Sequence, residues 1–212
     1  VVFMEGKKKG YSARYKRHVR GTILFALLLL VLISGLVKAN LTEAKVQKAQ
    51  KINSRDVKVE NAGCESMELN PLQQEKYPEV TEVVQRYYRS LGEKSSFADS
   101  YDDIIVYTKL GKYKDTYVAF VRYDMKIKDI YTKVPGLGTV YVAKDAEGEY
   151  QVSASPEDEE INAFIQEIAQ HEDVQALLEE TQTAYHEAVQ SDALLQEALT
   201  DLKNAYEDST GS

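Results

Sequence analysis

The sequence is poor in the residues that build disulfides and metal centres. Its 212 residues include one cysteine (Cys64), three histidines and no tryptophan. A single cysteine cannot form a disulfide within the chain, so the fold must depend on its apolar core. The histidines and Cys64 lack the spacing of zinc ligands, and no calcium loop, phosphate-binding loop or nucleophile elbow occurs. We therefore predict no metal and no cofactor.

Basic residues are nearly absent from one long segment. Residues 157–208 hold 15 acids and one base, Lys203, which gives a net charge of −14 against −8 for the whole chain. Nucleic-acid binding needs clustered lysine and arginine, and we predict none. The acids are interpreted either as solvated helix faces or as a surface that docks onto a basic partner.

Long hydrophobic runs are missing apart from one. The 17 residues Gly21–Val37 carry no charge, and a membrane helix needs about 17 to 25 apolar residues. Residues 1–20 carry seven bases and one acid, which favours a cytoplasmic N-terminus. We predict a single-pass membrane anchor with the C-terminal domain extracellular. The alternative is a signal peptide cleaved after Ala39, which would release a secreted protein.

The charge and hydrophobicity patterns divide the chain into five segments. We expect a basic cytoplasmic tail at 1–20, a transmembrane helix or signal sequence at 21–38, and a stalk or linker at 39–76. An α+β domain at 77–155 and an acidic helical segment at 156–208 follow. The stalk is predicted because scattered charges and few large apolar residues leave little to bury.

The α+β domain shows a change from helical to strand periodicity. Six apolar residues after Pro78 follow helical spacing and predict a helix over 78–91 that ends at Gly92: Val80, Val83, Val84, Tyr87, Tyr88 and Leu91. Alternation then predicts strands at 103–109, 116 to about 130, 140–143 and 150–153, with Pro135–Gly138 as a hairpin connection. The expected architecture is a helix packed on a four-stranded antiparallel sheet.

The two faces of the long second strand differ in character. The odd-numbered residues from Tyr117 to Ile127 are apolar and should pack under the helix. The other face begins with Val118 and Phe120 and becomes charged from Arg122 onward. We expect the apolar stripes of the C-terminal helices either to cover the sheet near Val118 and Phe120 or to pair with a partner.

Three stretches carry a resemblance to a known family: NPLQQEKYPEVTEVVQRYYRSL, YDDIIVYTKLGKYKDTYVAFVRYDMKIKDI and PGLGTVYVAKDAEGEYQVS. Over residues 70–205 the chain resembles uncharacterised membrane-anchored extracytoplasmic proteins of Gram-positive gut bacteria with an NTF2-like, cystatin-like domain. The resemblance implies a fold and a location but no functional residues, since that family has no established activity. The interval from Leu91 to Tyr101 is short for the extra helices that usually close an NTF2-like cone, which argues against a deep pocket.

Two functions from different classes remain open. The first is non-enzymatic binding or assembly at the outer membrane surface, with the C-terminal helices contacting a partner or a second copy. The layout is similar to the bitopic NTF2-like subunits of conjugation and type IV secretion machines. The second is a small-molecule enzyme or ligand carrier with a pocket between helix 78–91 and the sheet, in which Asp124 acts as a base near Tyr107 or Tyr123. The candidate site residues are Tyr87, Tyr88, Tyr107, Val118, Phe120, Tyr123 and Asp124.

Overall fold

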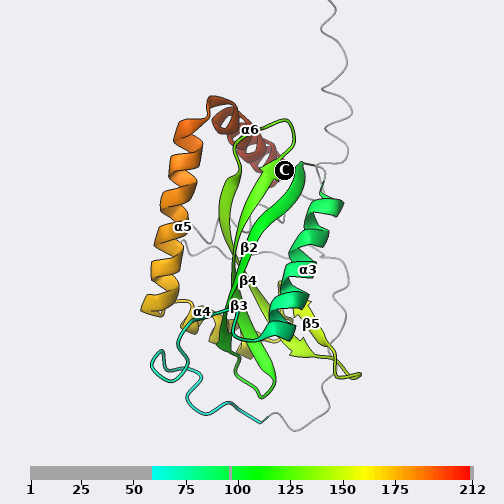
Figure 1. Cartoon of the computed structure of the whole chain (residues 1–212), viewed down its shortest axis with the longest axis vertical. Coiled ribbons are helices and arrows are strands. Elements are labelled where there is room, and N and C mark those ends of the chain that lie inside the picture. Colours follow the sequence, from blue (N-terminus) through cyan, green and yellow to red (C-terminus); the bar gives the residue numbers. More distant parts are fainter. Residues whose placement is uncertain (1–58, 96, 211–212) are drawn as a thin grey trace, which may run out of the picture.

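The computed structural model describes residues 59–95 and 97–210, and this part of the chain has an α+β fold (Figure 1). The predicted membrane segment, residues 21–37, and the stalk up to residue 58 lie outside the described residues. None of the helices in the described part is long and apolar enough to cross a membrane. The elements are, in chain order, β1 (Gln73–Gln74), α3 (Pro78–Lys94), β2 (Ala98–Leu110), β3 (Thr116–Ile127), β4 (Val134–Lys144), β5 (Tyr150–Ser153), α4 (Glu159–Ile168), α5 (Glu172–Ser191) and α6 (Ala193–Thr210).

The five strands form one antiparallel sheet in the order β1-β2-β3-β4-β5. The long strands β2, β3 and β4 make its centre. At one end β1 pairs with β2 at Tyr107 and Thr108, and β5 pairs with β4 from Tyr141 to Lys144. The sheet is therefore five strands wide at that end and three strands wide at the other. The sequence predicted four of these strands and missed the short, polar β1.

Pro135–Gly138 lies inside β4, so its prediction as a hairpin connection is wrong. Gly138 pairs with Val121 and Pro135 with Asp124, in regular antiparallel register. The proline is tolerated because β5 does not reach this part of β4, which is an edge in the described part of the chain. Strand β3 ends at Ile127, earlier than the predicted end near residue 130. Strand β2 begins at Ala98, earlier than the predicted start at residue 103.

Helix α3 covers one face of the sheet, as predicted. Val80, Val84 and Tyr88 are buried against the odd-numbered side chains of β3, including Val121. The helix continues two residues past the predicted stop at Gly92, to Lys94. A Cβ at that position would lie 3.0 Å from the Cα of Ser100, so the glycine allows α3 and β2 to approach closely.

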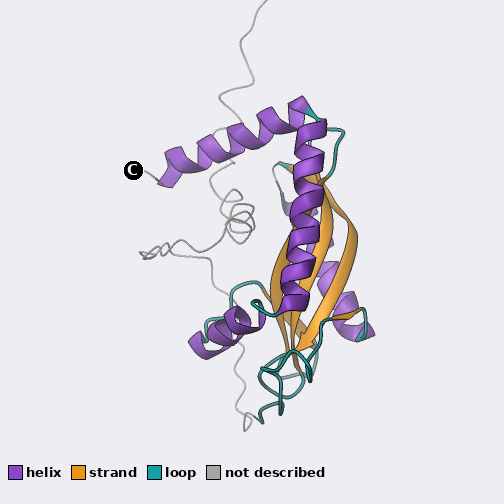
Figure 2. Cartoon of the chain, turned by 90° about the vertical axis from the view of Figure 1, so that its left-hand side faces the viewer, coloured by secondary structure: helices purple, strands orange, loops and turns teal. Residues whose placement is uncertain are grey.

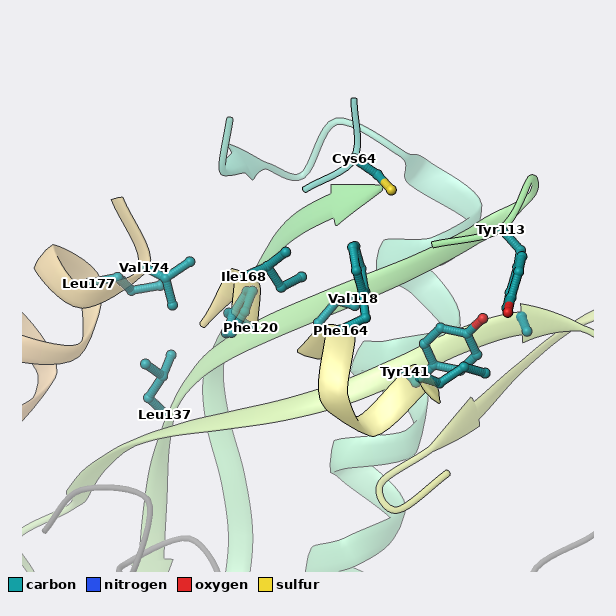
Figure 3. Close-up of a cluster of buried hydrophobic side chains, with 12 residues drawn as sticks. Cys64, Tyr113, Val118, Phe120, Leu137, Tyr141, Phe164, Ile168, Val174 and Leu177 are labelled. Atoms are coloured by element: carbon teal, nitrogen blue, oxygen red, sulfur yellow. The ribbon is translucent and has the colours of Figure 1, made fainter. Parts of the chain in front are cut away.

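Helices α4 and α5 cover the opposite face. Phe164 and Ile168 of α4 and Leu177 of α5 pack against Val118 and Phe120, as Figure 3 shows. This bears out the expectation that the C-terminal helices cover the sheet. Together with α3 they make a three-layer arrangement, which Figure 2 shows from the side of α5.

Helix α6 leaves α5 near the narrow end of the sheet (Figure 1), and Figure 2 shows it extending past the sheet to one side. The carboxylate of Asp192 accepts hydrogen bonds from the backbone amides of Leu194 and Leu195 and so caps the start of α6. Leu195 is fully buried beside Ile127 and Val134. Its neighbour Leu194 remains 63% exposed.

Residues 59–76 pack on the sheet, although they fall in the range expected to form a stalk. Cys64 is buried, and the amide nitrogen of Asn61 donates to the carbonyl oxygens of Gly111 and Tyr113, both at 2.8 Å. Glu60 forms a β-bridge with Tyr113. The folded unit therefore includes residues from Val59 onward rather than from Tyr77.

Candidate functional site

The structure divides the sequence-predicted site residues between two faces of the sheet. On the α3 side, Tyr88 and Tyr123 are buried and Tyr87 is half-buried. On the other side, Val118 and Phe120 belong to the core beneath α4 and α5. Tyr107 and Asp124 are half-buried on this second side as well. The seven residues therefore do not form one site.

Tyrosine rings fill the space between α3 and the sheet. The ring centroid of Tyr123 lies 5.3 Å from that of Tyr88 and 5.0 Å from that of Tyr101. Tyr101 is not among the site residues predicted from the sequence. Tyr123 also lies over Gly136 of β4, where an added Cβ would be 2.6 Å from the ring. Burial raises the pKa of Tyr101 to about 12 and that of Tyr123 well above its ordinary value. The phenols are neutral and act as packed aromatic core.

Asp124 lies on the opposite side of the sheet from Tyr123. Burial, followed by the negative charge of Asp103, raises the pKa of the Asp124 carboxyl, while the nearby cations Lys133 and Arg122 act in the other direction. The guanidinium of Arg122 pairs with Glu180 of α5 at 2.6 Å. The carboxylate and Tyr123 proposed as partners in a pocket are thus separated by the sheet.

A buried lysine forms an enclosed polar cluster, which the sequence interpretation did not find. The side chain of Lys109 is fully buried, and its ammonium donates to the carbonyl oxygen of Asn70 and to Oδ2 of Asp173, both at 2.8 Å. The same Oδ2 accepts from the amide of Leu72 at 2.7 Å. This cluster ties β2, α5 and residues 59–76 together. Its ammonium has no access to a substrate, so the role is structural.

A depression of about 610 Å³ opens beside the N-terminal half of β2, which lies in the three-stranded end of the sheet. There β2 has no strand on its outer side among the described residues, because β1 pairs only with Tyr107 and Thr108. The depression lies between the C-terminal end of α3, β2 and the segment that leads into β4. We call it the β2 edge site, and its lining residues are Arg89, Glu93, Asp99, Ser100, Tyr101, Asp102, Asp103, Ile104 and Lys133.

Four carboxylates and two cations line the β2 edge site. Lys133 is engaged by Asp102 at 3.2 Å and by Asp103 at 2.9 Å. Glu93 and Asp99 are exposed and make no ion pair within residues 59–95 and 97–210. No group of three or more metal-ligating side chains occurs in the described part of the chain. The site is thus an acidic surface beside an open strand edge.

The backbone of β2 is irregular along this edge. Register shifts occur between Ala98 and Ser100 and between Asp102 and Ile105, and Asp103 has a positive φ of 47°. Bulges and charges are devices by which edge strands avoid unspecific pairing. The regular pairing stretch available here is accordingly short.

Comparison with protein-family models, with curated proteins and with solved structures gave no match.

Proposed function

We propose that the chain is a non-enzymatic binding or assembly protein. The observation that carries this proposal is the filled interior. Tyr88, Tyr101 and Tyr123 occupy the space under α3, and α4 and α5 close the other face of the sheet. Binding must therefore use the outer surface, where the β2 edge site and helix α6 are accessible.

We also propose that residues 21–37 hold this unit at the outer face of the cell membrane, with the basic N-terminus in the cytoplasm. The long uncharged run and the +6 charge of residues 1–20 support this location. The helix α3 packed on an antiparallel sheet is consistent with an NTF2-like domain of the extracytoplasmic Gram-positive type. That assignment rests on the sequence resemblance.

The enzyme alternative draws support from one residue, Asp124, whose carboxyl pKa is raised by burial. However, a pocket between α3 and the sheet would need space that the tyrosine rings occupy. Asp124 also lies on the face of the sheet opposite to α3. The packing favours the binding proposal.

Photo-crosslinking in membranes tests the binding proposal. A benzoylphenylalanine placed at Arg89 reports on the β2 edge site, and one at Leu194 reports on α6. Both side chains are exposed. We expect at least one position to crosslink the full chain to a partner protein or to a second copy, while the same probe at exposed Glu82 does not. If all three positions crosslink to nothing, the proposal is wrong.

Location is tested separately. Glu147 lies exposed in the turn between β4 and β5 and can be replaced by cysteine in a chain carrying Cys64→Ser. We expect a membrane-impermeant maleimide to label this cysteine on intact cells. Labelling only after lysis would contradict the topology. A mature N-terminus at Asn40 would replace the anchor by the secreted alternative.

A further inference from the structure

The outer edge of β2 offers backbone groups that no described strand uses. From Ala98 to Ile105 the strand pairs only with β3 on its inner side. Gln85 of α3 donates from Nε2 to the carbonyl oxygen of Ile104 at 3.2 Å, which closes the edge at that point. At the start of the strand the Ala98 amide donates to Oγ of Ser95 at 2.9 Å, and the carbonyl oxygen of Asp99 lies close to Gly92 of α3. From Ser100 to Asp103 no strand of residues 59–95 and 97–210 pairs with the outer edge. An extended peptide can add to such an edge through main-chain hydrogen bonds, while its side chains supply specificity.

The charge of the site selects among extended peptides. Lys133 is already engaged by two aspartates, and among the remaining charges that line the site the carboxylates of Glu93 and Asp99 outnumber the guanidinium of Arg89 by two to one. Basic side chains on an added strand would form ion pairs with these carboxylates. The apolar stems of lysine could also lie against Ile104, which is half-buried in the site.

The same charges argue against pairing between two copies of the chain. Two β2 edges placed side by side would bring the Asp99 and Asp102 carboxylates of both copies together. Like charges directly opposite each other on paired strands are destabilising. The edge is therefore unsuited to self-association but complementary to a basic segment.

We propose that the β2 edge site binds an extended, lysine- or arginine-rich segment of a partner protein, which adds to β2 as a short antiparallel or parallel strand. This inference rests on the proposed binding function and names the chemistry of its partner. The register shifts at Ala98–Ser100 and Asp102–Ile105 limit the paired stretch. Charge must then supply much of the affinity, so binding should weaken steeply as salt is raised.

The test uses the full chain in detergent and three fluorescein-labelled decapeptides, with binding followed by fluorescence anisotropy. The first peptide alternates lysine and valine, the second glutamate and valine, and the third lysine and proline. We expect the lysine–valine peptide to bind and the glutamate–valine peptide not to bind. The lysine–proline peptide has the same charge, but every second residue lacks an amide hydrogen and has φ fixed at about −65°, away from the strand conformation. We therefore expect it to bind about tenfold more weakly.

Charge variants locate the binding on the protein. The double variant Glu93→Gln/Asp99→Asn removes two exposed carboxylates from the site, and we expect it to weaken lysine–valine binding at least about fivefold. The matched control Glu197→Gln/Asp201→Asn removes two exposed carboxylates from α6 and should leave binding unchanged. Since all four side chains are exposed, circular dichroism should show unaltered folding for both variants.

Each result decides the inference. Equal binding of the lysine–proline peptide, equal loss in both variants, or no binding of the lysine–valine peptide would overturn strand addition by a basic segment. The crosslinking experiment distinguishes this failure from failure of the binding proposal. Crosslinks that persist in Glu93→Gln/Asp99→Asn would leave the protein a binding protein that uses another surface.

Discussion

Replacing Lys109 with methionine should destabilise the fold strongly. Methionine keeps most of the apolar volume but removes the ammonium and its two hydrogen bonds, to Asn70 and to Asp173. Removing one partner of a buried ion pair costs about 3–5 kcal/mol, because the other is left unpaired. The side chain of Asp173 is 25% exposed and keeps its bond from the Leu72 amide, so water and this amide compensate in part. We expect a loss of about 3 kcal/mol, at the lower end of that range.

The predicted loss is measurable by thermal unfolding of the full chain in mild detergent, followed by far-ultraviolet circular dichroism. For a domain of this size, about 3 kcal/mol corresponds to a decrease in Tm of roughly 6–12 °C. The control is Lys112→Met, which breaks an ion pair with exposed Glu160 and should change Tm much less. The double variant Lys109→Met/Asp173→Asn should lose less stability than the sum of the two single losses, since it leaves no uncompensated charge.

The same cluster should contribute a pH dependence. Burial alone would raise the pKa of Asp173, but hydrogen bonds from Lys109 and from the Leu72 amide outweigh it and hold the pKa below the ordinary value of 3.8. A depressed carboxyl pKa stabilises the fold above the unfolded-state value, and this contribution is lost as the pH falls through the lower folded-state value. Lys109→Met should reduce that acid sensitivity. A Tm of Lys109→Met within about 2 °C of the parent would refute the reasoning.

Three further perturbations test other contacts. Gly136→Ala should cost about 1–3 kcal/mol in denaturant unfolding, because the new methyl group meets the Tyr123 ring, and Tyr123→Leu in the same chain should recover part of the loss. Asp124→Asn should raise Tm at neutral pH and leave it unchanged in acid, since a carboxyl whose pKa is raised by folding destabilises the fold only when ionised; a lower Tm at neutral pH would contradict this. Asp192→Ala removes the cap of α6 and the hydrogen bond from Thr132, so amide hydrogen exchange in α6 should become faster than in the parent protein, while exchange in α5 changes less. Equal α6 exchange rates in parent and variant would show that the cap is dispensable.

Periodicity made the large elements predictable. The valines and tyrosines of α3 recur at helical spacing, and the odd-numbered residues of β3 alternate without interruption, so both faces of their contact could be assigned. The same holds for the apolar stripes of α4 and α5, which include Phe164, Ile168 and Leu177 and pack against Val118 and Phe120. In each case apolar side chains carry the packing and leave a repeated signal in the sequence.

Residues 59–76 and Lys109 left no such signal. Asn70 holds this segment through its side-chain amide, which donates to the carbonyl oxygens of Cys64 and Leu110 and accepts from the Leu110 amide. Asparagines in a polar stretch are typical of loops, and a lysine in an alternating strand is typical of a solvated face. Their contacts become visible only when α5 and β2 are placed in space.

The Pro135–Gly138 stretch was misassigned for a different reason. Proline and glycine usually mark a turn, because one removes a donor and the other weakens a strand. In β4 both properties are useful: Pro135 lies on an edge without a partner in the described part of the chain, and Gly136 makes room for the Tyr123 ring. Local preference was overridden by tertiary packing.

The candidate site depended on the same kind of long-range information. Asp103 begins a predicted strand and Asp102 precedes it, and nothing in the sequence shows that β1 stops short of them or that Lys133 reaches them from beyond β3. Their bulge and charge prevent indiscriminate pairing at an open edge. The same features permit pairing with a strand of opposite charge, because specificity arises as much from the partners a surface repels as from those it attracts. An open edge that excludes its own copy and apolar strands is better suited to one basic partner than to general adhesion.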